Sequence, residues 1–372
     1  MNMNQLLFSL YLLLLATTGF AQKMKTQDSV QARIILVGDG GAFRNGKHPV
    51  VAAIKKMFEL DKKTTIVYLG DNVYQHGLPD DADVNYTTIR AVLDTQVNIA
   101  KNTPAKVYMI PGNHDWENGA RYGYDAILRQ QAYVNQLGDE NVSFIPRDGC
   151  PGPVDIKLSD DVVLIAFDSQ WWLHPNEKPD IESDCDCKTE SEFILALSEL
   201  LRDHYNKLVI LASHHPFRSN GIHGGYYGVK QHIFPFTDLN SKLYIPLPVI
   251  GSIYPIARGI FGNIQDLPHP AYQNMIRQIK AATSSHPNII FANGHEHNLQ
   301  LLKDDSGYHY IVSGSGCKVT RVNTNRKSLF ANASLGFAVL DISKNKTVRT
   351  SFYTVEADSS TARERYSDVI LD

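Results

Sequence analysis

Short apolar runs recur along this chain, and most of them stop at a glycine or at a group of polar residues. Apolar runs bounded in this way are typical of buried β-strands. We expect strands at residues 33–37, 66–69, 106–110, 162–167, 208–212 and 288–292. Between them, apolar residues recur with helical spacing, which predicts helices at residues 48–60, 87–100, 124–137, 191–201 and 271–282.

Strands and helices alternate through most of the sequence, which is the organisation of βαβ units and predicts an α/β fold. From Leu299 onward the pattern changes to short β segments, such as those at residues 308–314, 335–342 and 347–355. In open α/β sheets, ligands bind beyond the carboxyl ends of the strands. The residues that follow the predicted strands are therefore the first place to look for chemistry.

Polar side chains with metal-ligand character follow five of these strands. They are Asp39, Asp71 with Tyr74, Asn113 with His114, His214, and His295 with His297. Carboxylate, phenolate and imidazole groups suit ferric iron, whereas carboxylate, amide and imidazole groups suit a divalent ion. One aspartate can bridge two ions, and two ions about 3.5–4 Å apart activate a water for in-line attack at phosphorus.

The composition is that of an ordinary globular protein. The chain has 372 residues, of which 43% are hydrophobic and 20% are charged, so it can form one large α/β domain or two smaller ones. Its net charge of −3 provides no overall positive field for nucleic acid or an anionic membrane. We therefore expect no nucleic-acid binding, and the oligomeric state stays open.

The N-terminus has the pattern of a secretory signal peptide. Residues 6–15 are nearly all apolar, and the small residues Gly19 and Ala21 precede a cleavage site before Gln22. The first residues lack the usual lysine or arginine, and a retained membrane anchor is the alternative, although a span needs about 20 residues. We expect a signal peptide at 1–21 and a flexible lead-in at 22–31. The mature protein would be secreted or periplasmic, with no stable membrane span.

Four cysteines, at positions 150, 185, 187 and 317, become relevant because export permits disulfides. Four cysteines allow three pairings, and the sequence does not choose among them or exclude free thiols. Cys185 and Cys187 are too closely spaced for a zinc knuckle of the C-x2-C type, so we interpret the cysteines as structural.

The predicted catalytic domain spans residues 32–356. Two segments have a different pattern, one inserted in this domain and one following it. Residues 217–268 form an insertion rich in Gly, Tyr, Phe, Ile and Pro, which is either a surface excursion or a substrate-binding lid. Residues 357–372 are interpreted as a mobile C-terminal tail.

The motifs at the strand ends together resemble one family. Gly38-Asp39-Gly40-Gly41, Gly70-Asp71-Asn72-Val73-Tyr74, Gly112-Asn113-His114-Asp115, His214-His215-Pro216 and Gly294-His295-Glu296-His297 are similar to those of the calcineurin-like metallophosphoesterases. Tyr74 narrows the resemblance to purple acid phosphatases. The Gly-Gly pair after Asp39, GHEHNLQLL at 294–302 and IVSGSG at 311–316 resemble their small, tartrate-resistant branch.

This resemblance implies a four-layer α/β/β/α sandwich of two mixed sheets flanked by helices. It also implies roles at the matching positions. Asp39, Tyr74 and His297 would hold Fe(III), Asp71 would bridge, and Asn113, His214 and His295 would hold a divalent Fe, Zn or Mn ion. His114 and His223 would face the substrate, while His76 and Asp115 are candidates for outer positions around the site.

The activity implied is that of an acid phosphatase, in which a metal-bound hydroxide attacks a phosphomonoester and a protonated histidine assists the leaving group. A phosphodiesterase or nucleotide pyrophosphatase of the same superfamily shares these motifs and is the alternative. The remaining hypothesis is a non-catalytic binding module with this fold.

Overall fold

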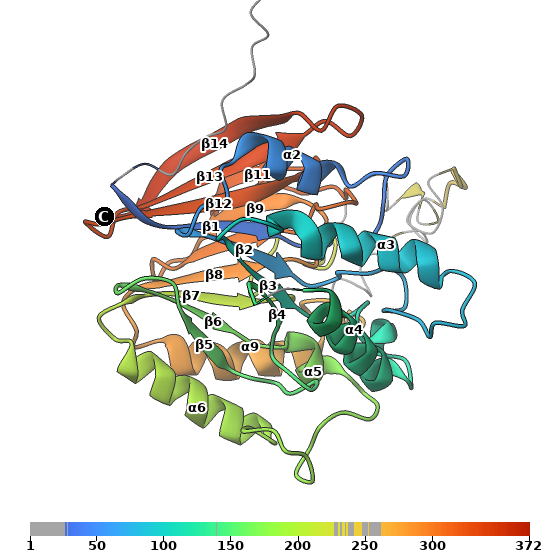
Figure 1. Ribbon diagram of the computed structural model, residues 1–372, viewed down its shortest axis with the longest axis horizontal. Helices are drawn as coiled ribbons and strands as arrows, with labels where there is room; N and C mark the ends of the chain where they lie inside the picture. Colours follow the sequence, from blue (N-terminus) through green and yellow to red (C-terminus); the bar gives the residue numbers. More distant parts are fainter. Residues whose placement is uncertain are drawn as a thin grey trace, which may run out of the picture.

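The computed structural model describes residues 27, 29–138, 140–226 and 262–372, together with isolated positions between 227 and 261. The predicted signal peptide, most of the lead-in and nearly half of the insertion lie outside the described residues. Within the described residues, two seven-stranded sheets pack face to face, and helices cover their outer faces (Figure 1). The described chain therefore forms the predicted four-layer α/β/β/α sandwich of two mixed sheets.

The first sheet has the strand order β14-β13-β12-β1-β2-β3-β4. Its strands are β1 (Val30–Val37), β2 (Thr64–Leu69), β3 (Lys106–Ile110), β4 (Val142–Phe144), β12 (Gly336–Ser343), β13 (Val348–Val355) and β14 (Ala362–Leu371). Strands β1 to β4 are parallel, and β12 to β14 extend the sheet with antiparallel pairing. The parallel part carries the first three polar turns to one edge of the sheet.

The second sheet has the strand order β11-β9-β10-β8-β7-β6-β5. Its strands are β5 (Val154–Lys157), β6 (Val162–Ala166), β7 (Leu208–Ser213), β8 (Ile289–Asn293), β9 (Leu299–Lys303), β10 (His309–Ser313) and β11 (Ser328–Asn332). Strands β6, β7, β8 and β10 run parallel, whereas β5, β9 and β11 are antiparallel to their neighbours. The carboxyl ends of β7 and β8 carry the histidine turns.

Helices cover the outer face of each sheet. The first sheet is covered by α2 (Pro49–Met57), α3 (Tyr86–Val97) with the 3-10 turn η1 (Asn98–Ala100), and α4 (Gly123–Leu137). The second sheet is covered by α5 (Ser169–Leu173), α6 (Glu190–Asp203) and α9 (Pro270–Thr283). A short 3-10 turn, η2 (Glu117–Gly119), follows β3. The bounds of α2, α3 with η1, α4, α6 and α9 agree with the predicted helices to within a few residues, whereas α5 was not predicted.

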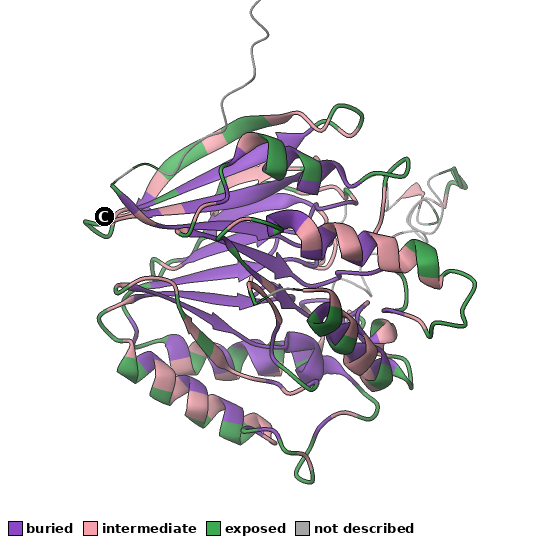
Figure 2. Ribbon diagram, viewed as in Figure 1, coloured by how far each residue is buried: buried purple, intermediate pink, exposed green. Residues whose placement is uncertain are grey.

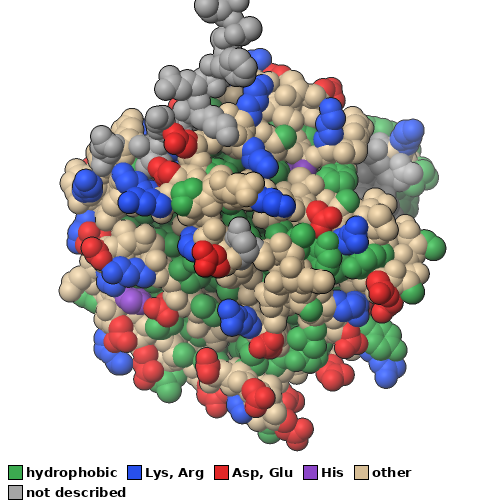
Figure 3. Space-filling view, viewed as in Figure 1, with side chains coloured by type: hydrophobic (Ala, Val, Ile, Leu, Met, Phe, Trp, Pro, Cys, Tyr) green, Lys and Arg blue, Asp and Glu red, His purple; other side chains and the backbone are tan. Residues whose placement is uncertain are grey.

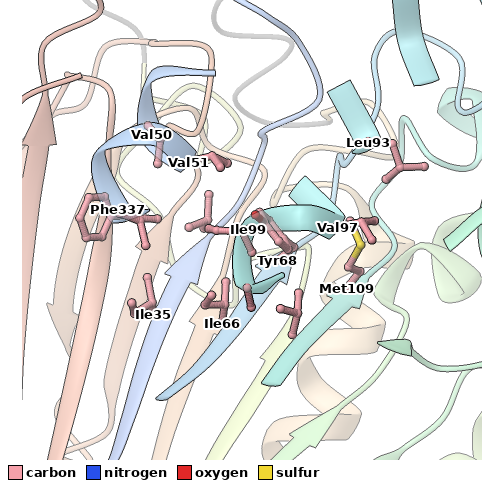
Figure 4. Close-up of a cluster of buried hydrophobic side chains, with 14 of the residues drawn as sticks. Ile35, Val50, Val51, Ile66, Tyr68, Leu93, Val97, Ile99, Met109 and Phe337 are labelled. Carbon is pink, nitrogen blue, oxygen red and sulfur yellow. The ribbon is translucent and has the colours of Figure 1, made fainter. Parts of the chain in front are cut away.

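Apolar side chains fill the three interfaces between the four layers. One cluster joins the helices to the first sheet, where Val50, Leu93 and Val97 meet strand residues such as Ile35 and Ile66 (Figure 4). A second cluster lies between the sheets, and a third lies under α6 and α9. Strands β2, β6, β7, β8 and β10 are buried along their whole length, and buried colour dominates the centre of Figure 2. Burial on both faces explains their continuous apolar runs.

The C-terminal segment corrects the sequence interpretation. Residues 362–371, assigned above to a mobile tail, form strand β14, which pairs antiparallel with β13. The ring of Tyr366 packs against Phe330 and Phe352, with centroids 5.2 and 6.3 Å apart. Charged residues such as Arg363 and Arg365 are exposed on this edge strand. They obscure the alternation of apolar and polar positions by which a strand is recognised in a sequence. The lead-in is likewise shorter than expected, because β1 already begins at Val30, which pairs with Ser343.

One disulfide is formed among the described residues, between Cys150 and Cys185, with Cα atoms 5.6 Å apart. It ties the connection before β5 to the loop that leads into α6. Cys187 and Cys317 are buried free thiols. No helix among the described residues has the length and apolar character needed to cross a membrane. Positive and negative side chains are interspersed over the face shown in Figure 3.

Candidate metal centre

Five strands deliver the predicted ligands to one place between the two sheets. Asp39, Asp71 and Asn113 follow β1, β2 and β3 of the first sheet, and His214 and His295 follow β7 and β8 of the second. Asp39, Asp71 and His295 have positive φ angles of 58°, 53° and 68°. Non-glycine residues rarely adopt this left-handed backbone, and such conformations concentrate at functional sites.

Two glycines allow the turns to approach this closely. A Cβ atom added at Gly112 would lie 2.4 Å from Oδ1 of Asp71, and one at Gly70 would lie 2.5 Å from Nδ1 of His214. Gly70 also has a φ of 88°, which favours glycine for a second reason. Gly70 and Gly112 are therefore required by the packing of the site itself.

One group of ligand atoms surrounds the amide of Asn113. Its Oδ1 lies 3.0 Å from Nε2 of His214 and 3.1 Å from Nδ1 of His295. The two imidazole nitrogens are 3.2 Å apart, and Oδ1 of Asp71 is 3.4 Å from Nε2 of His214. Four potential ligand atoms on four side chains thus face one point.

A second group surrounds the hydroxyl of Tyr74. This oxygen lies 3.1 Å from Oδ1 of Asp39 and 3.3 Å from Nε2 of His297. The distance between Oδ1 of Asp39 and Nε2 of His297 is 3.5 Å. Ligand atoms of Asp39, Asp71 and His297 all lie within 4.8 Å of one another, so Asp71 adjoins both groups. This is the position expected for a bridging carboxylate.

The spacing of these atoms fits metal coordination. Ligand atoms about 2.1 Å from one ion, at angles of about 90–109°, lie about 3.0–3.4 Å from each other. The separations of 3.0–3.5 Å lie within about 0.1 Å of that range in both groups. The first group offers amide, imidazole and carboxylate ligands for a divalent ion, and the second adds a phenolic oxygen that suits a harder ion. The residues therefore fit a dinuclear centre.

The electrostatics of the buried site also favour cations. Burial raises the pKa of Asp39 to about 8, whereas the charges of His214 and His114 outweigh burial and lower the pKa of Asp71 to about 2. Burial lowers the pKa of His297 to about 4 and the pKa of His295 well below its usual value. The imidazoles of His295 and His297 are thus neutral and have a lone pair to offer, and cations would permit Asp39 to ionise as well.

The two predicted substrate-facing histidines line the same cavity, which has a volume of about 170 Å³. His114 donates from Nδ1 to the carbonyl of Gln75 at 2.7 Å, and its backbone N–H donates to Asp71. Nδ1 of His223 lies 2.8 Å from Oδ1 of Asp266, and its ring is 4.1 Å from that of His295. The remaining lining residues are Asp71, Asn113, Asn118, Asn263, Gln265, His295 and His297.

Three other sequence candidates have different positions. His215 is near His295, but Ser169 and Gln265 contact its two ring nitrogens at 2.8 and 2.6 Å, so His214 is the available ligand. His76 is exposed, outside the cavity. Asp115 is buried and accepts from the backbone N–H groups of Asn72, Val73 and Gly112, so it joins two ligand loops instead of contacting the ring of His114.

Several residues of the site carried no recognised sequence signal. Asn118 accepts a hydrogen bond from Nδ2 of Asn113 at 2.9 Å, and Gln265 accepts one from Nε2 of His295 through its main-chain oxygen. Glu296 accepts from the loop that carries His223. Its position between two histidine ligands was the available clue, whereas nothing in the sequence connects Gln265 with His295.

The family of the chain follows from this geometry and from sequence comparison. Residues 32–314 match the Calcineurin-like phosphoesterase family. That match covers well over half of the 372 residues, so the chain belongs to the calcineurin-like phosphoesterases. Members of this family hydrolyse phosphoric esters at a dinuclear metal centre, which is the arrangement that the two ligand groups fit. No curated protein sequence matches the chain.

Solved structures with low sequence identity share the fold. GAP50, the anchor in the inner membrane complex of Plasmodium, is 18% identical with a TM-score of 0.57; the match covers 92% of this chain and 89% of that one. The purple acid phosphatase PPD1 of yellow lupin (Lupinus luteus) seeds is 13% identical with a TM-score of 0.50, and the match covers 92% of this chain but 54% of that one. PhoD is 10% identical with a TM-score of 0.52, covering 93% and 73%.

Proposed function

We propose that this protein is an acid phosphatase of the purple type, which hydrolyses phosphomonoesters with Fe(III) and a divalent Fe, Zn or Mn ion. The observation that carries this proposal is the position of Tyr74. Its hydroxyl lies 3.1 Å from Asp39 and 3.3 Å from His297, in ligand range of one ion. A phenolate among hard ligands favours ferric iron over a purely divalent pair.

Each of the two ions would be held by its own set of protein ligands. Asp39, Tyr74 and His297 would hold the ferric ion, and Asn113, His214 and His295 would hold the divalent ion, with Asp71 between them. When bound, the ions activate a water and neutralise the charge that develops at phosphorus. The buried, preorganised cage keeps these charges in position without reorganisation during the reaction.

The leaving group would receive its proton from His114. Because Nδ1 of this ring donates to the carbonyl of Gln75, Nε2 is the nitrogen available to the substrate. His223 lines the same cavity and would contact the phosphate or its ester group, held in place by Asp266. General acid catalysis of this kind contributes roughly 10²–10⁴-fold to a rate.

The tyrosinate assignment predicts colour. The iron-loaded, oxidised protein should absorb above about 500 nm through charge transfer from the Tyr74 phenolate to Fe(III), and Tyr74→Phe should lose this band. Absorption spectra with metal analysis of both proteins test this directly. A colourless wild-type protein that contains iron would contradict the assignment, and so would a band that survives in Tyr74→Phe.

A phosphodiesterase or nucleotide pyrophosphatase with the same cage is the competing activity, because the ligands do not distinguish the two classes of ester. Comparing the rates at which the protein hydrolyses an aryl phosphate and the corresponding bis-ester distinguishes the two activities. We expect the monoester to be hydrolysed faster. Asn113→Ala should abolish hydrolysis of both esters and leave the circular dichroism spectrum unchanged. Persistent hydrolysis in that variant would refute the assigned cage, whereas a metal-loaded wild type that hydrolyses neither ester would favour a binding role for this fold.

We further infer that the protein is exported, with residues 1–21 removed as a signal peptide. The disulfide between Cys150 and Cys185 supports this inference, because disulfides persist mainly in oxidising compartments. N-terminal sequencing of the mature protein should begin at Gln22. A mature chain that begins at Met1 would contradict cleavage.

A further inference from the structure

The side chain of Lys318 lies over the ring of the predicted ligand Tyr74. Its Nζ atom is 3.2 Å from the centroid of the ring, well inside the distance at which an ammonium group is attracted to an aromatic face. Lys318 is half-buried, which strengthens the interaction relative to an exposed contact. None of the residues predicted from the strand-end motifs supplies this charge.

The backbone around Lys318 is attached to two metal ligands. The N–H of Cys317 donates to the carbonyl of Asp39 at 3.0 Å, and the N–H of Thr320 donates to the carbonyl of His297 at 2.8 Å. Lys318 lies between these two contacts. The backbone of Lys318 is therefore positioned by the same turns that hold Asp39 and His297, and its side chain extends from there over the ring of Tyr74.

The other side chains around the ring are of a different kind. The ring of His114 contacts that of Tyr74 edge to face, with centroids 4.6 Å apart, and the Tyr74 hydroxyl faces Asp39 and His297. Lys318 is thus placed on the face of the ring, away from the ligand oxygen. A cation at this position acts on the electrons of the phenolate without competing for the metal.

We propose that Lys318 tunes the tyrosinate and the ion it holds, an inference that rests on the ferric assignment proposed above. Charge transfer moves an electron from the phenolate to iron, away from the ammonium group, so Lys318 stabilises the ground state and raises the transition energy. Adding an electron to the iron site next to a positive charge is favourable, so Lys318 also raises the Fe(III)/Fe(II) potential.

The test replaces the charge while keeping the length of the side chain. In iron-loaded Lys318→Met, the tyrosinate band should move to longer wavelength and the midpoint potential of the iron should fall, as measured by spectroelectrochemistry. Lys318→Arg retains the charge and should stay near the wild-type values. Lys318→Gln provides a second neutral variant if Lys318→Met does not fold.

A matched control is available at Lys178. Its Nζ atom lies 4.5 Å from the centroid of Trp171, a half-buried contact between lysine and an aromatic ring that is no metal ligand. Lys178→Met should leave the band unchanged. A wild-type band that does not move in either neutral variant overturns the role of Lys318 alone, whereas the absence of any band in the iron-loaded wild type overturns the ferric assignment and this inference together.

Discussion

At the scale of single residues, the predicted ligands His214, His295 and Asn113 each have one atom committed to the protein and one atom left for a metal. His214 donates from Nδ1 to the carbonyl of Leu69, which leaves Nε2 free, and His295 donates from Nε2 to the carbonyl of Gln265, which leaves Nδ1 free. Partners of this kind fix the orientation and tautomer of a ligand. The neighbouring group therefore determines which atom of each of these side chains faces the metal position.

Asn118 orients the amide of Asn113 in the same way. It accepts from Nδ2 of Asn113, so that Oδ1 faces His214 and His295, and it lies in a turn where Glu117, Asn118 and Gly119 all have positive φ. Asn118→Gly suits that backbone but removes the acceptor. We expect the affinity for a divalent ion to fall about 10-fold, as is typical for lost partners of metal ligands, measured by zinc titration calorimetry of the metal-depleted protein.

Asn118→Asp is the matched variant, because its carboxylate keeps an acceptor for Nδ2 of Asn113. Its zinc affinity should remain at or above the wild-type value. Equal affinity in wild type and Asn118→Gly would show that the amide of Asn113 is oriented by the metal alone.

At the scale of elements, the substrate side of the site depends on one loop and on the acid that anchors it. Glu296 is fully buried between two ligand residues, and its side chain serves the loop that carries His223. Oε1 accepts from the hydroxyl of Ser219 at 2.7 Å and from the N–H of Gly224 at 3.0 Å, and Oε2 accepts from the N–H of Ile222. The position of His223 therefore depends on this carboxylate.

Glu296→Gln replaces one acceptor oxygen by an NH2 donor that faces other donors. We expect the free energy of unfolding to fall by about 2 kcal/mol, and kcat to fall with it because His223 loses its fixed position. Denaturant unfolding and steady-state kinetics measure the two effects. Glu192→Gln is the control, because Glu192 accepts two backbone hydrogen bonds before α6, far from the site. Unchanged kcat in Glu296→Gln would contradict the anchoring role.

The elements that sequence patterns predict well are those whose environment is local or uniform. Strand β2 is apolar throughout because both of its faces are buried, and its terminal Gly70 and Asp71 mark the site directly. Strand β14 was missed because its outward residues are charged and its inward side chains, such as Tyr366 and Ile370, pack against residues distant in the sequence. The sequence also does not predict that residues 263–266 lie at the metal site. Gln265 contacts His295 through a main-chain atom, so its residue type gives no signal.

At the scale of the whole molecule, the candidate metal centre draws its residues from both sheets. The first sheet supplies Asp39, Asp71 and Asn113, whereas the second supplies His214 and His295. Because the ions would bind only when both sheets are in place, the free energy of metal binding is also free energy of folding. The site and the sandwich should therefore stabilise each other.

The disulfide between Cys150 and Cys185 is a second constraint at this scale. It closes a segment with a sequence separation of 35, and in the chain-entropy model such a loop contributes about 3–4 kcal/mol. The double substitution Cys150→Ala with Cys185→Ala should lower the free energy of unfolding by that amount, measured by urea denaturation. Cys187→Ala is the control and should cost less, because its thiol is not cross-linked. Equal losses would argue against a contribution from the cross-link.

The main-chain contact between Gln265 and His295 has a consequence for how such a protein can diversify over generations. All seven predicted ligands lie outside residues 217–268, and the hydrogen bond from this segment to His295 is made by a backbone carbonyl, which every amino acid possesses. Natural selection can therefore rewrite the side chains around the substrate while the inherited metal cage stays the same. A lineage built on this architecture can change what it hydrolyses without first losing the ability to hydrolyse.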